Sequence, residues 1–128
     1  MATIRTLFRG DADADEPAAL IPGLFLLRNA EEWDSHWRLM SRDREPAPVS
    51  WDTELVLLLV LGVRPTTGYH VTIEDVVGRV RRLEAHAVEQ RPGGFTGPMR
   101  TVPVHAVAIP AAGDRDELTL IQRIVITG

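Results

Sequence analysis

The stretch LVLLLVLGVRPTTGYHVTI, residues 55–73, decides the fold of this 128-residue chain. Its first part, residues 55–61, is entirely apolar, which is too short to span a bilayer and typical of a strand buried on both faces. Residues 62–68, with Pro65 among them, interrupt the apolar run and predict a stiff turn. Apolar and polar residues then alternate over residues 69–73, as in a strand with one buried and one wet face. The stretch therefore predicts a core strand, a corner and a half-buried second strand.

The following segment, residues 80–89, is predicted to pair with this second strand as a hairpin. A three-residue turn at 77–79, with a bulge at Gly78, keeps apolar side chains together on one face, whereas a two-residue turn mixes apolar with charged positions. We therefore expect the longer turn. The apolar pairs are then Tyr69–Ala87, Val71–Ala85 and Ile73–Leu83.

The same register places His70 opposite His86 on the solvated face of the hairpin. With Glu74 or Glu84 beside them, two imidazoles form a ligand set suited to zinc. Two exposed imidazoles without a metal are the simpler interpretation of this pattern. A metal site at His70 and His86 is therefore a secondary hypothesis, and no cofactor is expected.

An amphipathic helix is predicted after Asn29, a favourable N-cap that is followed three residues later by Glu32, as in a capping box. Trp33, Trp37 and Met40 recur on one face of this helix. We expect both indoles to pack the helix onto a sheet. A cavity beside Trp33 and Trp37 that holds a small ligand is the alternative interpretation.

Four further segments have strand character. Residues 20–27 are interrupted by proline and glycine, which predicts a bent or edge strand. Pro103 predicts that residues 101–109 form an edge strand or that the proline lies at the start of the strand. Residues 3–9 and 117–126 bring the total to about seven strands. The predicted fold is mainly β, of the α+β class: a small antiparallel β-sandwich or open barrel with one amphipathic helix packed on it.

Composition limits the function classes. A net charge of −4 and a pI of about 5.5 argue against a general binder of nucleic acid or of anionic membranes. The chain has neither cysteine nor lysine, which excludes disulfides, thiolate catalysis and Schiff-base chemistry. Its length suits one domain over residues 1–128, which we expect to be a monomer or a homodimer. The sequence has no apolar segment long enough to span a membrane. We therefore expect a soluble, cytoplasmic protein.

Groups for catalysis are scarce in this sequence. Ser35, Ser41 and Ser50 lie in the predicted helix or in polar loops, and none has the pattern of a nucleophile elbow. No nucleophile with a matching base emerges from the sequence, so an enzyme is not expected.

Two loops carry residues suited to contact with a partner. Residues 90–100 contain three glycines and two prolines, which predicts irregular structure. Phe95 and Met99 in this loop are either tucked back onto the core or offered to a partner. In the corner, Arg64 either braces loop carbonyls or a carboxylate, or acts as a surface anchor.

The corner sequence GVRPTTGYHV, residues 62–71, resembles the signature G-x-R-P-T-G-G-Y-x-V of the PrcB C-terminal-like family. Thr67 stands where that family usually has glycine, so a positive φ is not expected there. Residues 32–37 are similar to the family's E-W-x-x-L-W pattern, and residues 101–107 to its P-Y-H-x-V strand. The resemblance covers about residues 20–110.

The family takes its name from a subunit of a bacterial surface protease complex that binds and stabilises its partners. The resemblance implies a non-catalytic protein-binding or complex-stabilising role, with a protein partner such as a protease or protease complex. The alternative function is the small-ligand or metal-binding module outlined above. The candidate partner-binding residues are Arg64, Pro65, Thr66, Tyr69, Phe95 and Met99.

Overall fold

The computed structural model of the chain describes residues 4–13, 20–41, 44–94, 97, 99–111, 113 and 115–127. Within these residues seven strands and one helix form, as the sequence predicts. In chain order they are β1 (Arg5–Asp11), β2 (Gly23–Leu27), α1 (Ala30–Met40), β3 (Glu54–Val60), β4 (His70–Gly78), β5 (Arg82–Pro92), β6 (Pro103–Pro110) and β7 (Glu117–Thr127). No helix in this part of the chain is long and apolar enough to cross a membrane.

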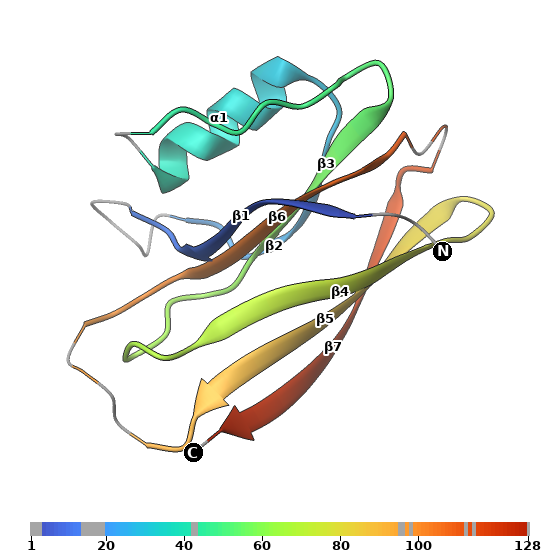
Figure 1. Ribbon diagram of the computed structural model, residues 1–128. Coiled ribbons are helices and arrows are strands. Elements are labelled where there is room, and N and C mark those ends of the chain that lie inside the picture. The colour runs from blue at the N-terminus through green and yellow to red at the C-terminus, as the bar shows by residue number, and fades with distance from the viewer. Residues whose placement is uncertain are drawn as a thin grey trace.

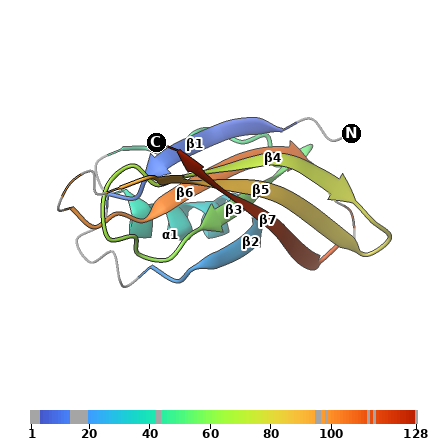
Figure 2. The same ribbon diagram turned by 90° about the horizontal axis from the view of Figure 1, so that it is seen from below.

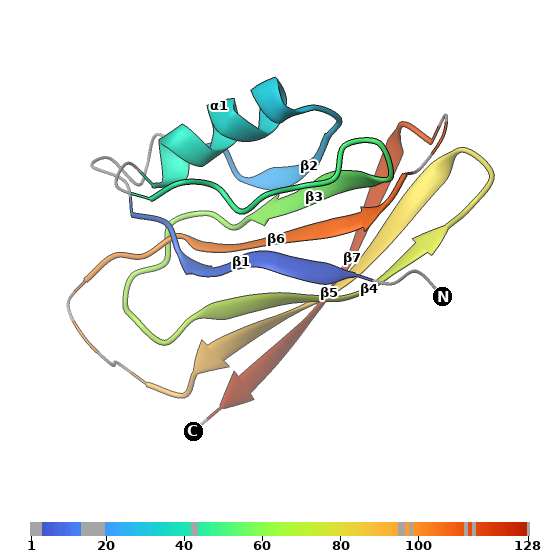
Figure 3. The ribbon, with the colours of Figure 1, turned by 45° about the horizontal axis from the view of Figure 1, so that its top comes forward.

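The elements form three layers (Figure 1). A four-stranded sheet in the order β1-β6-β3-β2 lies between α1 on one side and the three-stranded sheet β4-β5-β7 on the other (Figure 3). Figure 2, seen from below, shows β7 running diagonally across the direction of β1 and β6. The two sheets form a sandwich and neither closes into a barrel, which confirms the predicted mainly β, α+β class.

β3 lies in the interior of the larger sheet, between β6 and β2, and is buried on both faces as predicted. Leu55, Leu57 and Leu59 belong to the hydrophobic cluster between the two sheets. Val56 and Leu58 belong to a second cluster, which the sheet shares with the helix. The seven apolar residues are therefore explained by two cores on opposite faces of one strand.

α1 packs on the larger sheet through Trp33, Trp37 and Met40, each at most 5% exposed, as predicted. Asn29 caps the helix, because its side chain accepts a hydrogen bond of 2.9 Å from the backbone N–H of Glu32. The indole N–H groups of Trp33 and Trp37 donate to carbonyls of the loop that follows the helix, at 3.2 and 2.6 Å. The two tryptophans therefore fix both the helix and the loop after it.

The predicted register of the β4–β5 hairpin is wrong. Ile73 lies opposite Ala87 rather than Leu83, and Val71 lies opposite Glu89. The extra residue is Glu74 in β4 and not Gly78, which pairs with Leu83. The turn lies farther along the chain, where Arg79 N–H donates to the carbonyl of Arg82 at 2.7 Å.

The physical reason is that a register change of an even number of residues keeps every side chain on its own face. Alternation of apolar and polar residues therefore predicts the buried face of β4 but not the partner of each residue. Val71 and Ile73 do face inward, with 1% exposure each. Tyr69, expected in the strand, lies just before β4 and is half-buried.

One strand differs from the antiparallel arrangement that the sequence predicts, and the structure decides between the two predicted positions of Pro103. β7 pairs with β5 in parallel, because the chain passes through β6 in the other sheet before it returns to β5. β6 is an interior strand between β1 and β3, so Pro103 marks its first residue and not an edge. β2, in contrast, is an edge strand as expected.

Candidate functional site

Glu89, at the corner end of the inter-sheet core, is a fully buried carboxylate. On β5 it continues the inward series of Leu83, Ala85 and Ala87, so its side chain enters a layer that is otherwise apolar. A buried carboxylate requires a compensating partner. Arg64 supplies it with a two-pronged pair, Nε to Oε2 at 2.8 Å and Nη2 to Oε1 at 3.0 Å.

Two more side chains complete the shell of the Glu89 carboxylate. Arg91 donates at 3.1 and 3.3 Å, and the amide nitrogen of Gln122 on β7 donates at 3.0 Å. Burial raises the pKa of the Glu89 carboxyl, but the hydrogen bonds from Arg64 and Arg91 outweigh it and hold the pKa below its ordinary value. The corner, β5 and β7 are thus joined at a single ionised group.

The backbone of the corner is joined to the segment that leads into β6. Arg64 and Thr101 exchange two backbone hydrogen bonds, at 2.7 and 3.0 Å. Thr66 donates from its hydroxyl to the carbonyl of Gly97 at 2.5 Å and accepts from the N–H of Gly97 at 2.9 Å. Gly68 adopts a φ of 95°, which a residue with a side chain rarely adopts. The two loops expected to contact a partner are therefore one connected structure.

The outer surface of this connected corner carries exposed apolar side chains. Met99 is 66% exposed, Val63 is 36% exposed, and Pro65 is exposed as well. The guanidinium of Arg64 lies over the ring of the half-buried Tyr69, at 6.0 Å from its centroid. We call the surface formed by Val63, Pro65, Tyr69 and Met99 the corner surface.

The structure thus brings Arg64, Pro65, Thr66, Tyr69 and Met99 to one end of the sandwich. Thr66 is buried, with 5% exposure, and holds the adjoining loop from inside. Arg64 braces both a carboxylate and the carbonyl of Gly62, at 3.2 Å, as one of the sequence-based interpretations states. Phe95 lies outside the described residues.

Sequence reasoning missed two partners of Arg64, namely Glu89 and Thr101, and it missed Arg91 and Gln122, which are partners of Glu89. A signal for Glu89 is present in the sequence, since it occupies an inward position in the alternation of β5. A charged residue at a strand position where the alternating pattern predicts a buried apolar side chain indicates a buried ion pair. Gln122 gives no such signal, because its position beside Glu89 depends on the parallel pairing of β5 and β7.

The two histidines proposed as metal ligands are not brought opposite each other. His70 lies opposite Gln90, and His86 lies opposite Asp75. His86 instead contacts Glu84 on its own strand, at 3.0 Å. Within the described part of the chain, no group of three or more histidine, cysteine, aspartate and glutamate side chains is arranged to hold a metal.

His105 on β6 joins the two sheets. Its Nδ1 accepts a hydrogen bond of 2.7 Å from the backbone N–H of Ile73 on β4, so the proton of the neutral ring lies on Nε2. Nε2 then donates to the hydroxyl of Thr6 on β1, at 3.0 Å. Burial, with a smaller contribution from Arg9, lowers the pKa of His105 from 6.5 to about 4. The imidazole is therefore a neutral structural link.

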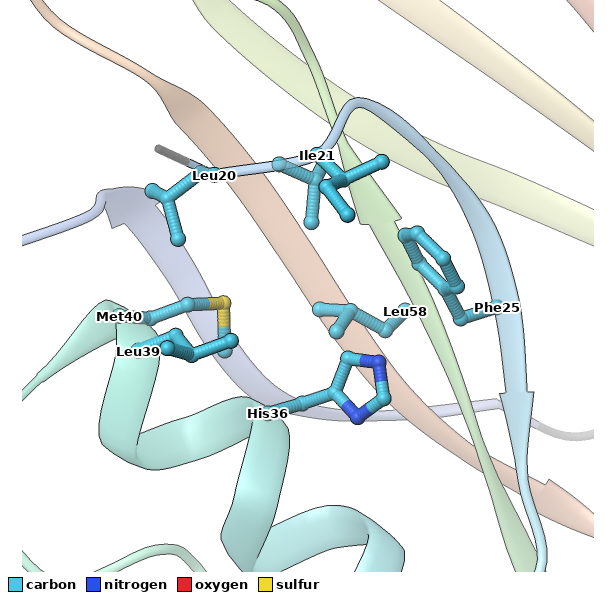
Figure 4. A pocket seen from close by; sticks show the side chains of 8 residues that line it. Leu20, Ile21, Phe25, His36, Leu39, Met40 and Leu58 are labelled. Carbon is cyan, nitrogen blue, oxygen red and sulfur yellow. The ribbon is translucent and has the colours of Figure 1, made fainter. Parts of the chain in front are cut away.

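An apolar hollow lies between α1, β2 and β3 (Figure 4). It has about 430 Å³ of empty space, part of it open to solvent. Among the described residues of its wall, only His36 has side-chain nitrogen or oxygen atoms, and its Nδ1 donates to the carbonyl of Glu32 at 3.0 Å. Neither tryptophan lines this hollow. Trp37 lines a separate hollow of about 490 Å³ with mostly polar walls, so a cavity is present beside this tryptophan.

Comparison with curated proteins and with solved structures gives no match. Comparison with protein families, in contrast, gives a match. The matched segment runs from β3 through the corner, β4 and β5 to β6, and contains both Arg64 and Glu89. The helix, which also showed a resemblance in sequence, lies outside it. Residues 55–110 of this chain match the family model described as PrcB C-terminal, which confirms the resemblance carried by the corner.

Proposed function

We propose that this chain is a non-catalytic protein-binding domain and that the corner surface is its contact site. The observation that supports the proposal most directly is the combination of exposed apolar side chains with a rigid support. Met99 and Val63 are exposed, while the backbone beneath them is joined by the Arg64–Thr101 bridge and the Arg64–Glu89 pair.

Rigidity matters for the free energy of binding. A partner that docks on a preformed loop does not lose affinity to ordering of that loop. Thr66 and Glu89 make their hydrogen bonds inside the chain, so both are satisfied before any partner arrives. The match of this same segment to the PrcB C-terminal family favours a protein partner, such as a subunit of a protease complex, that the domain stabilises.

The proposal predicts that a charge on the corner surface abolishes binding. We expect Met99→Asp and Val63→Asp each to weaken capture of partners from an extract of the native cell at least about tenfold, because apolar anchors dominate interfaces. The measurement is affinity purification with quantitative mass spectrometry, in parallel with the unaltered chain.

Val80→Asp is the matched control for this experiment. Val80 is 95% exposed in the β4–β5 hairpin, at the other end of β4 from the corner. Its substitution changes charge and hydrophobicity in the same way and leaves the corner surface intact. Partners captured equally by all four proteins would contradict the proposed contact site.

The apolar hollow of Figure 4 supports a second candidate function, the binding of a small apolar molecule. Because Nδ1 of His36 donates to a helix carbonyl, Nε2 of the neutral ring is left to accept a hydrogen bond. The ring also lies 5.2 Å from that of Phe25, centroid to centroid. The hollow therefore suits a small ring or chain that carries one hydroxyl or N–H donor.

Thermal-shift measurements with phenol, indole and cyclohexanol test this second function. Binding to the folded chain raises Tm, and we expect the rise to disappear in Leu39→Trp, which fills the mouth of the hollow. Val80→Trp serves as the control and should retain the rise. The second function is rejected if none of the three compounds shifts Tm, or if Leu39→Trp responds as the unaltered chain does.

A further inference from the structure

β7 ends the three-stranded sheet and has an open edge. It is the last strand in the order β4-β5-β7, and no strand in the described part of the chain pairs with its outer side. It is also long, with eleven residues, and it carries four exposed large apolar side chains. These are Leu120, Ile121, Ile124 and Ile126, exposed by 36%, 45%, 51% and 73%.

The other sheet edges are protected. β2 has only five residues, and β1 carries Arg5 and Arg9. The outer edge of β4 is covered by the larger sheet, since the N–H of Ile73 donates to His105 and Arg9 donates to the hydroxyl of Thr72 at 3.1 Å. Short strands, charges and covering elements are the usual means by which proteins prevent pairing at an edge. β7 is long, no described strand pairs with its outer edge, and its charged residues are Glu117 at its first position and Arg123.

Both polar side chains in the middle of β7 are directed back over their own sheet. Gln122 bonds to Glu89 on β5, and Arg123 reaches across β5 to Glu74 on β4, at 3.0 Å. Neither is therefore held at the open edge. The open edge of β7 therefore presents backbone N–H and C=O groups flanked by apolar side chains.

We infer that β7 pairs with β7 of a second copy of this chain, antiparallel and with Gln122 on the two-fold axis. In this register residues at equal distances on either side of Gln122 lie opposite each other. Every residue also stays on its own face of the sheet, because such residues differ by an even number of positions. The pairs are Glu117–Thr127, Leu118–Ile126, Thr119–Val125, Leu120–Ile124 and Ile121–Arg123.

Self-complementarity of β7 favours a second copy as the occupant, because Leu118 and Leu120 lie opposite Ile126 and Ile124 of that copy. Like charges do not meet in this register, since Glu117 faces Thr127 and Arg123 faces Ile121. Leu120 and Ile124 lie on the same face of β7 as the inward-facing Leu118. Leu120 of each copy lies opposite Ile124 of the other, so the symmetric contact contains this apolar pair twice. Closed two-fold symmetry is also the commonest arrangement of protein oligomers. The two smaller sheets then become one continuous sheet.

The size of the contact sets the expected strength. An antiparallel pairing of eleven residues makes about ten hydrogen bonds, the number found in an ordinary protein interface. A contact made by one strand and its side chains lies at the low end of interface areas. We therefore expect a reversible dimer with a Kd on the order of micromolar. The dimer contact lies on β7, whereas the corner surface lies on the loops between β3 and β4 and between β5 and β6, so the two proposals are tested separately.

Sedimentation velocity over a range of concentrations tests the dimer. The unaltered chain should pass from monomer to dimer as its concentration rises, and Ile124→Lys and Leu120→Glu should each remain monomeric. Val80→Lys, on the hairpin, should dimerise normally. Far-UV circular dichroism verifies that each variant is folded. A monomeric unaltered chain at all concentrations, or an undiminished dimer in Ile124→Lys, would overturn the inference.

Mixing the two charged variants tests the register itself. In the proposed pairing, residue 124 of one copy lies opposite residue 120 of the other, so Ile124→Lys and Leu120→Glu should form a heterodimer together although each alone does not. A mixture that remains monomeric, while the unaltered chain dimerises, would refute this register. Because the chain has no cysteine, Gln122→Cys provides a second measurement and should form a disulfide-linked dimer on oxidation.

Discussion

Glu89 is the residue on which the corner depends, because it is the buried charge that holds Arg64. Arg64 is itself largely covered, with 21% of its side chain exposed. If the carboxylate loses its charge, the guanidinium remains in the same place without compensation. Removal of one member of a buried pair is far more destabilising than the net stabilisation that the intact pair provides.

We predict that Glu89→Gln lowers the free energy of unfolding by about 3 kcal/mol, since the isosteric amide leaves the Arg64 guanidinium without its counter-charge. The matched control is Glu74→Gln, whose pair with Arg123 is exposed by half or more on both sides. That substitution should change stability by less than about 1 kcal/mol. Urea unfolding of the three proteins measures both effects, and equal losses in the two variants would show that burial of the pair is not decisive.

At the scale of elements, the position of each strand is well predicted while its partner is not. The apolar run of β3 and the alternation in β4 are local properties, and both predict burial correctly. The register of β4 against β5 depends on where the bulge falls, and Glu74 has no feature that marks it as the extra residue. Pairing of β7 with β5 depends on the path through β6, which no pattern within β7 records.

The link between β4 and β6 through His105 predicts a dependence of stability on pH. The folded chain holds the neutral imidazole, with a pKa near 4, whereas the unfolded chain takes up a proton near pH 6.5. Between these values the unfolded state binds more protons, so stability falls as the pH falls. A shift of this size corresponds to a loss on the order of 3 kcal/mol between pH 6.5 and pH 4.

Unfolding free energies at pH 7 and pH 4.5 measure this effect. In His105→Asn the side-chain oxygen can still accept from the N–H of Ile73, but the group does not titrate. The variant should therefore lose less stability on acidification than the unaltered chain. The assignment to His105 is wrong if both proteins lose the same amount, and carboxylates such as Glu89 would then account for the dependence.

At the scale of the whole molecule, the sequence predicts the layers but not the surfaces. Mainly β structure and the helix packed through Trp33 and Trp37 follow from periodicity alone. The joining of the corner to the Gly97–Thr101 loop does not, because it arises from contacts between segments more than thirty residues apart. The hollow of Figure 4 was likewise not predictable in place, since its walls come from three separate segments.

β3 belongs to both hydrophobic clusters, and this shared membership has a consequence for how the chain unfolds. Detachment of α1 exposes Val56 and Leu58, the face opposite to the one that holds the smaller sheet. Loss of either layer thus removes support from the strand on which the other layer rests. We expect the helix and the sandwich to melt in one transition, with the amide protons of β3 among the last to exchange with solvent.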